Sequence, residues 1–395
     1  MKKILIHIGG FHAGGAEKSL VSFLSTIPKD RYHIDILVYR CDGLFSTLVP
    51  NFVSVKEIPF PYKCLGVSLS NVEFYLKHNP KFLIKKILGL LAIKTSSRYS
   101  PPQVVWKLWK NTIPQYPEKY DVAISYIEGV TNYYVIDKVT AKKKILWVHN
   151  EYSKLRYSAD FDYSYFCRAD AVVTISQLCK DDLVNNFPSI KDKFKILQNI
   201  VNPNLIKELS DADIDDSSFN NCKSKYKILS IGRLCPQKNF ELAIHAAEIL
   251  KKNGFNFTWF IIGEGPLYGS LVALCKKLGV MDNFVFLGLK ANPYFYIKHT
   301  DIFVMPSIFE GKSIALEEAK ILCKPIVCTN FKTAFDAIEN NITGIITNMQ
   351  PQDMADSIYT VCTDCKLRDR LTSNLSKLQF DNTSEISNYI QLIGA

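Results

Sequence analysis

Residues Lys227 to Lys238 read KILSIGRLCPQK, a short apolar run that ends in a glycine and is followed by two cations. The next segment, Asn239–Asn253, places small and aliphatic residues on one side at helical spacing. The apolar run is continuous rather than alternating, which is typical of a strand covered on both faces. A buried strand, a tight loop and an amphipathic helix in this order predict one βα unit of an α/β protein.

The same unit recurs along both halves of the chain. Short apolar runs separated by helix-length segments predict parallel sheets with right-handed crossovers. The expected strands are Lys3–Ile8, Ile34–Tyr39, Asp121–Tyr126, Lys144–His149, Ala171–Ile175, Lys227–Ile231, Phe257–Ile262, Asn283–Leu287, Asp301–Met305, Pro325–Thr329 and Gly344–Thr347. The expected fold class is therefore α/β, with doubly wound parallel sheets.

The length of 395 residues suits two domains better than one. A polar stretch rich in Asp, Ser and Asn interrupts the repeating pattern near its middle. We expect a first domain over 1–205, a linker over 206–224, a second domain over 225–380 and a C-terminal helix over 381–395. Packing of that helix against the first domain is one option. Ligands of doubly wound folds bind at the carboxyl ends of the strands, so a cleft between the domains is the expected site.

Two cations follow the strand of the opening stretch. Arg233 offers a planar fork to two oxygens, and Lys238 offers a compact charge on a flexible stem. Gly232 lets the backbone approach a ligand closely. The pair suits a diphosphate; the alternative is that both are ordinary surface cations.

A second strand-to-helix segment, residues 306–319, carries two carboxylates. Glu310 lies in its loop, and Glu318 lies within the helix that follows. The backbone amides of Ser313 and Ile314 open that helix, and a helix start favours an anion. The segment therefore suits a nucleotide-sugar, with Glu318 at the ribose and Glu310 at the sugar.

The first strand of the chain runs into a glycine-rich loop, Gly9 to Glu17, before a helix begins. Gly14 and Gly15 stand where a ligand could approach the backbone. The spacing is not the G-x-G-x-x-G of nicotinamide enzymes, and taken alone the loop is equally a tight turn.

These motifs resemble family 4 of the retaining glycosyltransferases, whose GT-B architecture has two facing Rossmann-like domains and an interdomain cleft. The matching segments, in chain order, are Gly14-Gly15-Ala16-Glu17, Gly232-Arg233-Leu234 with Lys238, Gly263-Glu264-Gly265-Pro266-Leu267, and Glu310 with Glu318-Ala319. The resemblance implies that the donor is bound by Gly14, Gly15, Arg233, Lys238, Gly263, Gly265, Gly311, Ser313, Ile314 and Glu318.

The family also has a histidine at the end of an N-terminal-domain strand, and His149 matches it. The resemblance implies that His149 hydrogen-bonds a hydroxyl of the donor sugar and that Glu310 contacts the sugar near its anomeric centre. These two are the candidate catalytic residues; a packed or capping role is the alternative for the histidine. Lys312 and Ser313 replace a Phe and a Gly common in the family, which leaves the donor sugar open.

The net charge is +10, and the excess lies in the first half of the chain. No acidic residue stands between Glu73 and Glu118, where basic and bulky apolar residues are interleaved. Such a segment suits the surface of an anionic membrane; the alternative is a solvated helical face. No nucleic-acid recognition motif accompanies it, so no nucleic-acid partner is expected. The candidate membrane-surface residues are Lys77, Lys81, Lys85, Lys86, Trp106 and Trp109.

Eleven cysteines without a repeating spacing indicate reduced thiols rather than a disulfide framework. The lysines at the start precede an apolar run that a histidine interrupts, so a strand is expected there rather than a signal peptide. No membrane-spanning helix, no metal site and no cofactor are expected. These features predict a cytoplasmic protein, peripheral on the inner face of the cell membrane.

The resemblance implies transfer of a sugar from a nucleoside diphosphate sugar, UDP-sugar in particular, to a glycan acceptor with retention of anomeric configuration and without a metal. The basic segment favours a lipid-linked acceptor of capsule or O-antigen synthesis. Two alternatives stay open. A nucleotide-sugar epimerase of GT-B type needs no acceptor, and a non-catalytic protein would only bind sugar-nucleotide or membrane.

Overall fold

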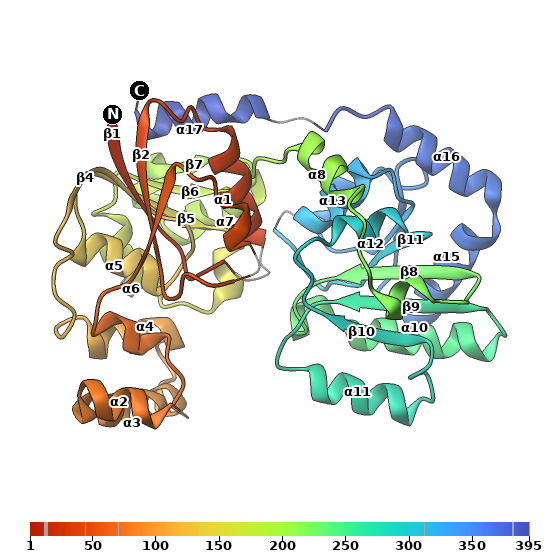
Figure 1. Cartoon of the computed structure of the whole chain (residues 1–395), viewed down its shortest axis with the longest axis horizontal. Coiled ribbons are helices and arrows are strands. Elements are labelled where there is room, and N and C mark those ends of the chain that lie inside the picture. Colours follow the sequence, from red (N-terminus) through yellow and green to blue (C-terminus); the bar gives the residue numbers. More distant parts are fainter. Residues whose placement is uncertain (12–14, 44, 70, 312, 381–382, 395) are drawn as a thin grey trace. The chain divides into compact units, whose positions relative to one another are not determined.

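The computed structural model describes residues 1–395 apart from 12–14, 44, 70, 312, 381, 382 and 395. The chain forms two compact units, one made of Met1–Ile200 with Ser384–Ala395 and the other of Val201–Thr383 (Figure 1). Each unit is built on a parallel sheet with helices packed on it. The α/β class with two Rossmann-like domains is therefore confirmed.

The first unit contains a parallel sheet that has seven strands among the described residues, in the order β3-β2-β1-β4-β5-β6-β7. The order reverses between β1 and β4, which is the switch point of a doubly wound fold. The strands are β1 Lys2–His7, β2 Tyr32–Val38, β3 Val53–Glu57, β4 Lys119–Ser125, β5 Thr140–Val148, β6 Ala171–Thr174 and β7 Phe194–Ile196.

Both faces of this sheet are buried, which explains the continuous apolar runs. Side chains alternate along a strand, so Leu5 of β1 joins one core cluster while Ile4 and Ile6 join another. The helices of the unit are α1 Gly15–Thr26, α2 Val72–His78, α3 Pro80–Thr95, α4 Pro101–Trp109, α5 Val130–Lys138, α6 Ala159–Phe166, α7 Gln177–Asn186 and α17 Ile386–Ile393.

The C-terminal helix α17 packs on the first unit although it follows the second in sequence. Tyr389 is buried, stacks on Phe23 of α1 with ring centroids 4.9 Å apart, and donates its hydroxyl to the carbonyl of Gln198 at 3.0 Å. Ile393 joins the same core cluster. Apolar contact and a hydrogen bond thus attach the end of the chain to its first unit.

The second unit contains a parallel sheet whose described part has six strands in the order β10-β9-β8-β11-β12-β13. Its strands are β8 Tyr226–Ile231, β9 Phe257–Ile262, β10 Phe284–Gly288, β11 Ile302–Met305, β12 Ile326–Thr329 and β13 Ile345–Thr347. Its helices are α8 Pro203–Ser210, α9 Ser217–Asn220, α10 Phe240–Lys252, α11 Tyr268–Lys277, α12 Tyr294–Lys298, α13 Ile314–Ile321, α14 Ala334–Ala337, α15 Pro351–Thr363 and α16 Cys365–Ser376.

The segment 206–224 differs from the expected linker, because it belongs to the second unit. Phe219 of α9 is buried against Phe260 of β9, with ring centroids 4.8 Å apart. Asp216 accepts hydrogen bonds from Lys290 at 2.7 Å and from Tyr296 at 2.8 Å. The polar composition of residues 206–224 reflects helix caps and ion pairs on the surface of the second unit rather than a flexible linker.

Each of the eleven expected strands is present, with small shifts at most ends. Two further strands, β3 and β7, lie at the two edges of the first sheet. The sequence of β3, Val-Ser-Val-Lys-Glu, alternates apolar and polar residues, and β7 is only three residues long. Edge strands carry a weaker apolar signal because fewer neighbours cover them.

Candidate functional site

Two loops of the second unit, after β8 and after β9, lie in close contact. Gly263 has φ +150°, and a Cβ there would stand 2.0 Å from the carbonyl oxygen of Gly232. A Cβ on Gly265 would stand 2.4 Å from the carbonyl oxygen of Leu234. Glycine is thus needed at both positions because the loop that carries Arg233 lies so close. The two glycines help to position that loop.

A buried ion pair joins the loop after β8 to the loop after β11. Lys238 Nζ lies 2.6 Å from Glu310 Oε1, and Ser307 donates its hydroxyl to the same oxygen at 2.6 Å. Only 18% of the lysine side chain and 9% of the glutamate side chain are exposed. Thr333 donates to the Glu310 carbonyl at 2.9 Å, so both ends of Glu310 are fixed.

The same two loops are also tied through Gln237. The side-chain amide of Gln237 donates to the Phe309 carbonyl at 3.0 Å. The backbone carbonyl of Gln237 accepts the Ile308 amide at 2.8 Å. Arg233 beside them is exposed, and its guanidinium has no side-chain or backbone partner among the described residues. Two loops joined by these contacts therefore present the paired Lys238 and the exposed Arg233 at the carboxyl ends of neighbouring strands.

Helix α13 begins at Ile314, directly after the loop that holds Glu310. Ser313 is its N-cap, and the serine hydroxyl does not cap the first turn. The first amides of a helix lack intrahelical acceptors and attract anions. Gly311 precedes this start and is half-buried. Lys312 lies outside the described residues.

Glu318 of α13 is buried with the hydroxyl of Tyr294 from α12 beside its carboxylate. Burial and this carboxylate hold the pKa of the Tyr294 hydroxyl well above its usual range. Tyr294 is a residue that sequence reasoning missed. Only the fold brings α12 against α13, and no motif marks the tyrosine.

The first unit places His149 at the end of β5, where it is buried. Its Nε2 lies 2.8 Å from the carbonyl oxygen of Tyr126. A carbonyl only accepts, so Nε2 carries the proton and Nδ1 is left as an acceptor in the neutral ring. Burial lowers the pKa of His149, while the nearby Glu128 carboxylate opposes that shift.

Glu128, just after the neighbouring strand β4, is a second residue that the sequence did not reveal. Its Oε2 accepts the backbone amide of His149 at 3.0 Å, and its Oε1 accepts the Asn150 side-chain amide at 2.6 Å. One carboxylate thus holds the backbone of His149 and the side chain of Asn150, the two residues that directly follow β5. A signal was present in principle, because both residues follow strands that are adjacent in the sheet.

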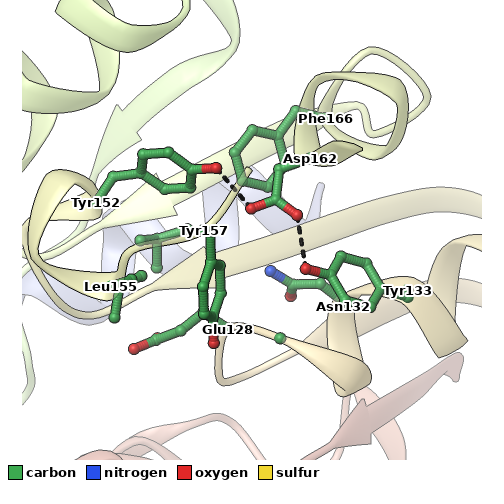
Figure 2. Close-up of a pocket in the computed structure, with 10 residues that line it drawn as sticks. Glu128, Asn132, Tyr133, Tyr152, Leu155, Tyr157, Asp162 and Phe166 are labelled. Atoms are coloured by element: carbon green, nitrogen blue, oxygen red, sulfur yellow. Dashed lines mark hydrogen bonds between the residues drawn. The ribbon is translucent and has the colours of Figure 1, made fainter. Parts of the chain in front are cut away.

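Glu128 also lines a small pocket of the first unit, drawn in Figure 2. Its polar centre is Asp162, which accepts hydrogen bonds from the hydroxyls of Tyr133 at 2.6 Å and Tyr152 at 2.7 Å. Burial raises the pKa of the Asp162 carboxyl. The side chains fill the pocket, so it serves as a packed polar network rather than a ligand site.

The glycine-rich loop is only partly described. Gly14 lies outside the described residues, and Gly15 is exposed as the first residue of α1. Glu17 follows in the first turn, where burial raises the pKa of its carboxyl to about 7.

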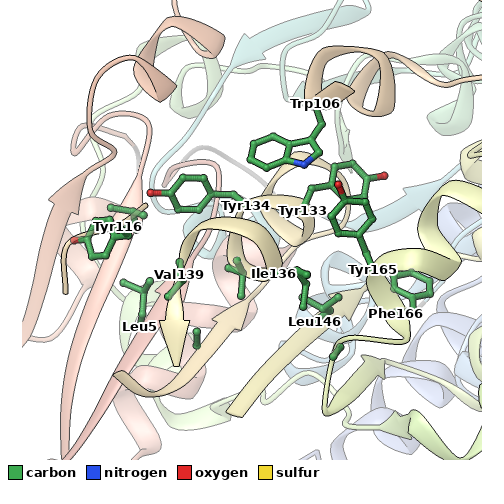
Figure 3. Close-up of a cluster of buried hydrophobic side chains, with 14 of the residues drawn as sticks. Leu5, Trp106, Tyr116, Tyr133, Tyr134, Ile136, Val139, Leu146, Tyr165 and Phe166 are labelled. Carbon is green, nitrogen blue, oxygen red and sulfur yellow. The ribbon is translucent and has the colours of Figure 1, made fainter. Parts of the chain in front are cut away.

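The prediction that Trp106 and Trp109 face a membrane is wrong, because both are buried in the core of the first unit. Figure 3 shows Trp106 beside Tyr133 and Tyr134, and its indole donates to Asp137 at 3.0 Å. The tryptophans alternate with basic residues in sequence because α4 buries one side and exposes the other.

Two of the predicted membrane-surface cations are also engaged within the protein. Lys86 donates to the Leu65 carbonyl at 2.8 Å, and Lys85 lies 3.3 Å from the Thr112 hydroxyl. The role predicted for Lys86 is therefore wrong, because its ammonium points inward. Lys77 and Lys81 are exposed.

Comparison with known protein families finds a match within the second unit. Residues 211–377 match the family model described as Glycosyl transferases group 1. The match covers most of the second unit and none of the first. The group 1 region contains both loops, the Lys238–Glu310 pair and α13. Across the described part of the chain, no three His, Cys, Asp or Glu side chains gather as ligands of a metal would.

Two curated relatives match about half of the chain. A glycosyltransferase of Methanocaldococcus jannaschii is 31% identical over 201 residues, 48% of this chain and 49% of the relative. The N-acetylgalactosamine-N,N'-diacetylbacillosaminyl-diphospho-undecaprenol 4-alpha-N-acetylgalactosaminyltransferase of Campylobacter jejuni is 32% identical over 203 residues, 51% of this chain and 53% of the relative. The chain thus covers about half the length of these relatives.

Among solved structures, Anabaena HepE in complex with UDP and glucose matches with a TM-score of 0.69 at 17% identity. The match covers 99% of this chain and 98% of that one. At this identity the likeness shows the fold, which is that of the GT-B glycosyltransferases.

Proposed function

We propose that the chain is a retaining glycosyltransferase that moves a sugar from a nucleoside diphosphate sugar, UDP-sugar in particular, to a glycan acceptor. The observation that carries the proposal is the cluster in the group 1 region: the exposed Arg233, the Lys238–Glu310 pair and the start of α13. The names of the relatives support it, since the Campylobacter relative transfers N-acetylgalactosamine and the HepE complex holds UDP and glucose.

The donor diphosphate is assigned to the two cations. The exposed Arg233 would offer its planar guanidinium to two phosphate oxygens, and Lys238 would exchange Glu310 for phosphate when the donor binds. Negative charge gathers on the diphosphate as the sugar leaves, and fixed cations with helix amides stabilise that charge. Ser313 and Ile314 would supply those amides, and the Glu318 carboxylate would accept hydrogen bonds from the ribose.

The sugar is assigned to Glu310 and His149. Neutral His149 with Nε2–H held by Tyr126 would offer Nδ1 to a sugar hydroxyl. Retention is assigned to a same-face attack, in which the acceptor oxygen bonds to the anomeric carbon as the bond to phosphate breaks. The acceptor's proton then passes to a leaving phosphate oxygen, so no covalent nucleophile is needed.

The acceptor is assigned to a lipid-linked intermediate of capsule or O-antigen synthesis, met at the inner face of the cell membrane. The basic segment of the first unit and the diphospho-undecaprenol acceptor named for the Campylobacter relative support this assignment. No described helix is both long and apolar enough to cross a bilayer. We further assign metal-independent catalysis and no cofactor, because Arg233 and Lys238 can neutralise the diphosphate.

The decisive experiment incubates the protein with a panel of nucleotide-sugars and an extract of bacterial membrane lipids. Release of nucleoside diphosphate together with a longer lipid-linked glycan is the expected result. An isomerised donor without acceptor growth would instead identify an epimerase. Donor binding without turnover on any acceptor would identify a non-catalytic binding protein.

A further inference from the structure

The outward face of α3 is apolar. Ile84, Ile87, Leu88 and Leu91 have 60%, 44%, 55% and 54% of their surface exposed. Their spacing of i, i+3, i+4 and i+7 places them on one face of the helix. Soluble proteins scatter exposed aliphatic side chains singly, so a stripe of four calls for a partner.

The opposite face of α3 is already used for packing. Phe82 stacks on Trp109 of α4 with ring centroids 5.6 Å apart, and Leu108 of α4 lies beside Gly89, 3.8 Å from where a Cβ would stand. Lys86 on this inner side donates to the Leu65 carbonyl. Figure 1 shows α2 and α3 at the edge of the first unit, with α4 between them and the rest of that unit. The stripe therefore lies on the face of α3 opposite the one that packs on the first unit.

The charges around the stripe are of one sign. Lys81 and Lys94 lie near the two ends of α3 and are exposed, as is Lys77 of α2. No acidic residue occurs from residue 74 to 117. A partner must therefore offer apolar depth to the aliphatic side chains and negative charge to the lysines.

We propose that the outward face of α3 inserts into the headgroup boundary of an anionic lipid bilayer. Ile84, Leu88 and Leu91 enter the acyl region, and Lys81 and Lys94 meet lipid phosphates at either end. A second copy of the chain fits less well, because symmetric pairing would bring the same lysines together. The attachment itself does not depend on the proposed function. Its role does rest on that function, because the attachment would bring the enzyme to a lipid-linked acceptor.

The test measures binding of the full chain to vesicles of phosphatidylcholine with and without phosphatidylglycerol, by flotation. The wild type is expected to float only with anionic vesicles. Ile84→Gln/Leu88→Gln is expected to bind at least about tenfold more weakly, as loss of buried apolar area predicts. The matched control, Ile342→Gln/Leu378→Gln, changes two exposed aliphatic residues of the second unit and should bind within about twofold of wild type.

The charge requirement is tested separately. Lys81→Ala/Lys94→Ala should weaken binding by about fivefold for each lysine removed, since each is worth about 1 kcal/mol at an anionic surface. The control Lys29→Ala/Lys142→Ala removes two exposed lysines outside α3 and should lose much less. Equal binding by the Ile84→Gln/Leu88→Gln variant and the wild type, or no binding by the wild type, overturns the inference. So does self-association in ultracentrifugation that the same variant abolishes.

Release of nucleoside diphosphate from the donor in buffer without vesicles separates the two proposals. The α3 variant should keep the wild-type rate, because no residue of α3 belongs to the donor cluster. Vesicle binding without any donor turnover would overturn the proposed function but support membrane attachment through α3. Donor turnover with vesicle binding that does not depend on α3 would support the proposed function but overturn attachment through α3.

Discussion

Lys238 and Glu310 form an ion pair in the group 1 region, with 2.6 Å between Nζ and Oε1. Ser307 donates its hydroxyl to the same carboxylate oxygen, so a second hydrogen bond holds the Glu310 carboxylate in place. The carboxylate fixes the lysine in place and also competes with a phosphate for it. Donor binding and release of Glu310 are therefore expected to be coupled.

Lys238→Ala should lower the free energy of unfolding by about 3 kcal/mol, because it leaves the mostly buried Glu310 carboxylate without its cation. Urea denaturation measures this. Adding Glu310→Gln removes the stranded charge, so Lys238→Ala/Glu310→Gln should regain most of the stability and none of the UDP affinity. A double variant as unstable as the single one would show that the ion pair is not the cause.

Arg233→Ala should weaken binding of UDP by about tenfold or more, since a hydrogen bond to a charged group is worth about 1.5–3 kcal/mol. Calorimetric titration gives the affinity. The matched control is Arg370→Ala, an exposed arginine of α16 outside the cluster, which should bind UDP as the wild type does. Unchanged affinity in the Arg233 variant would contradict the phosphate assignment.

Gly263→Ala should destabilise the second unit by about 3 kcal/mol or more, because its φ of +150° strains any side chain and its Cβ would meet the Gly232 carbonyl. Gly269→Ala is the control, since a Cβ at this position of α11 meets no atom within 4 Å. Helix propensity makes that change neutral or stabilising by up to about 1 kcal/mol. Similar unfolding midpoints for the two variants would contradict the close approach of the loops.

Glu17 makes stability depend on pH in a defined direction. Its folded pKa of about 7 lies above the ordinary 4.5, so between these values the native state keeps a proton that the unfolded state has lost. Stability should fall as pH rises from 4.5 to 7 and level off above, by at most about 3 kcal/mol. Urea denaturation of wild type and Glu17→Gln at pH 5 and pH 8 checks this: the advantage of the variant should appear at pH 8. An advantage that does not change with pH would refute it.

Full transfer activity is expected in the presence of a strong chelator, because the proposed charge stabilisation comes from Arg233, Lys238 and helix amides. The assay compares nucleoside diphosphate release with and without EDTA after dialysis. Recovery of a lost activity on adding Mg²⁺ or Mn²⁺ would overturn metal independence.

Local signals explain why much of the donor cluster could be predicted. Arg233 and Glu310 each follow a buried strand, and an apolar run that stops at a glycine or proline marks that place in the sequence alone. Parallel strands then bring such loops to one edge of the sheet. The ion pair itself, across 72 positions of sequence, is visible only in the fold.

The basic segment shows where sequence patterning fails. Interleaved basic and apolar residues indicate a helix with two faces, but they do not say which face meets the protein. Trp106 and Trp109 turned out to be core, and the exposed apolar face belongs to α3 around Leu88. Glu128 was missed for a related reason, because nothing local to it points to the amide of His149.

By itself, then, the sequence determined the α/β class, eleven strands, the strand-end loops and the match of residues 211–377 to the group 1 family model, since these depend on composition and spacing within short stretches. Tertiary structure alone decided the partners of Lys238, His149 and Lys86, the return of α17 to the first unit and the outward face of α3. Those features depend on contacts between distant segments and on which side of each helix is buried.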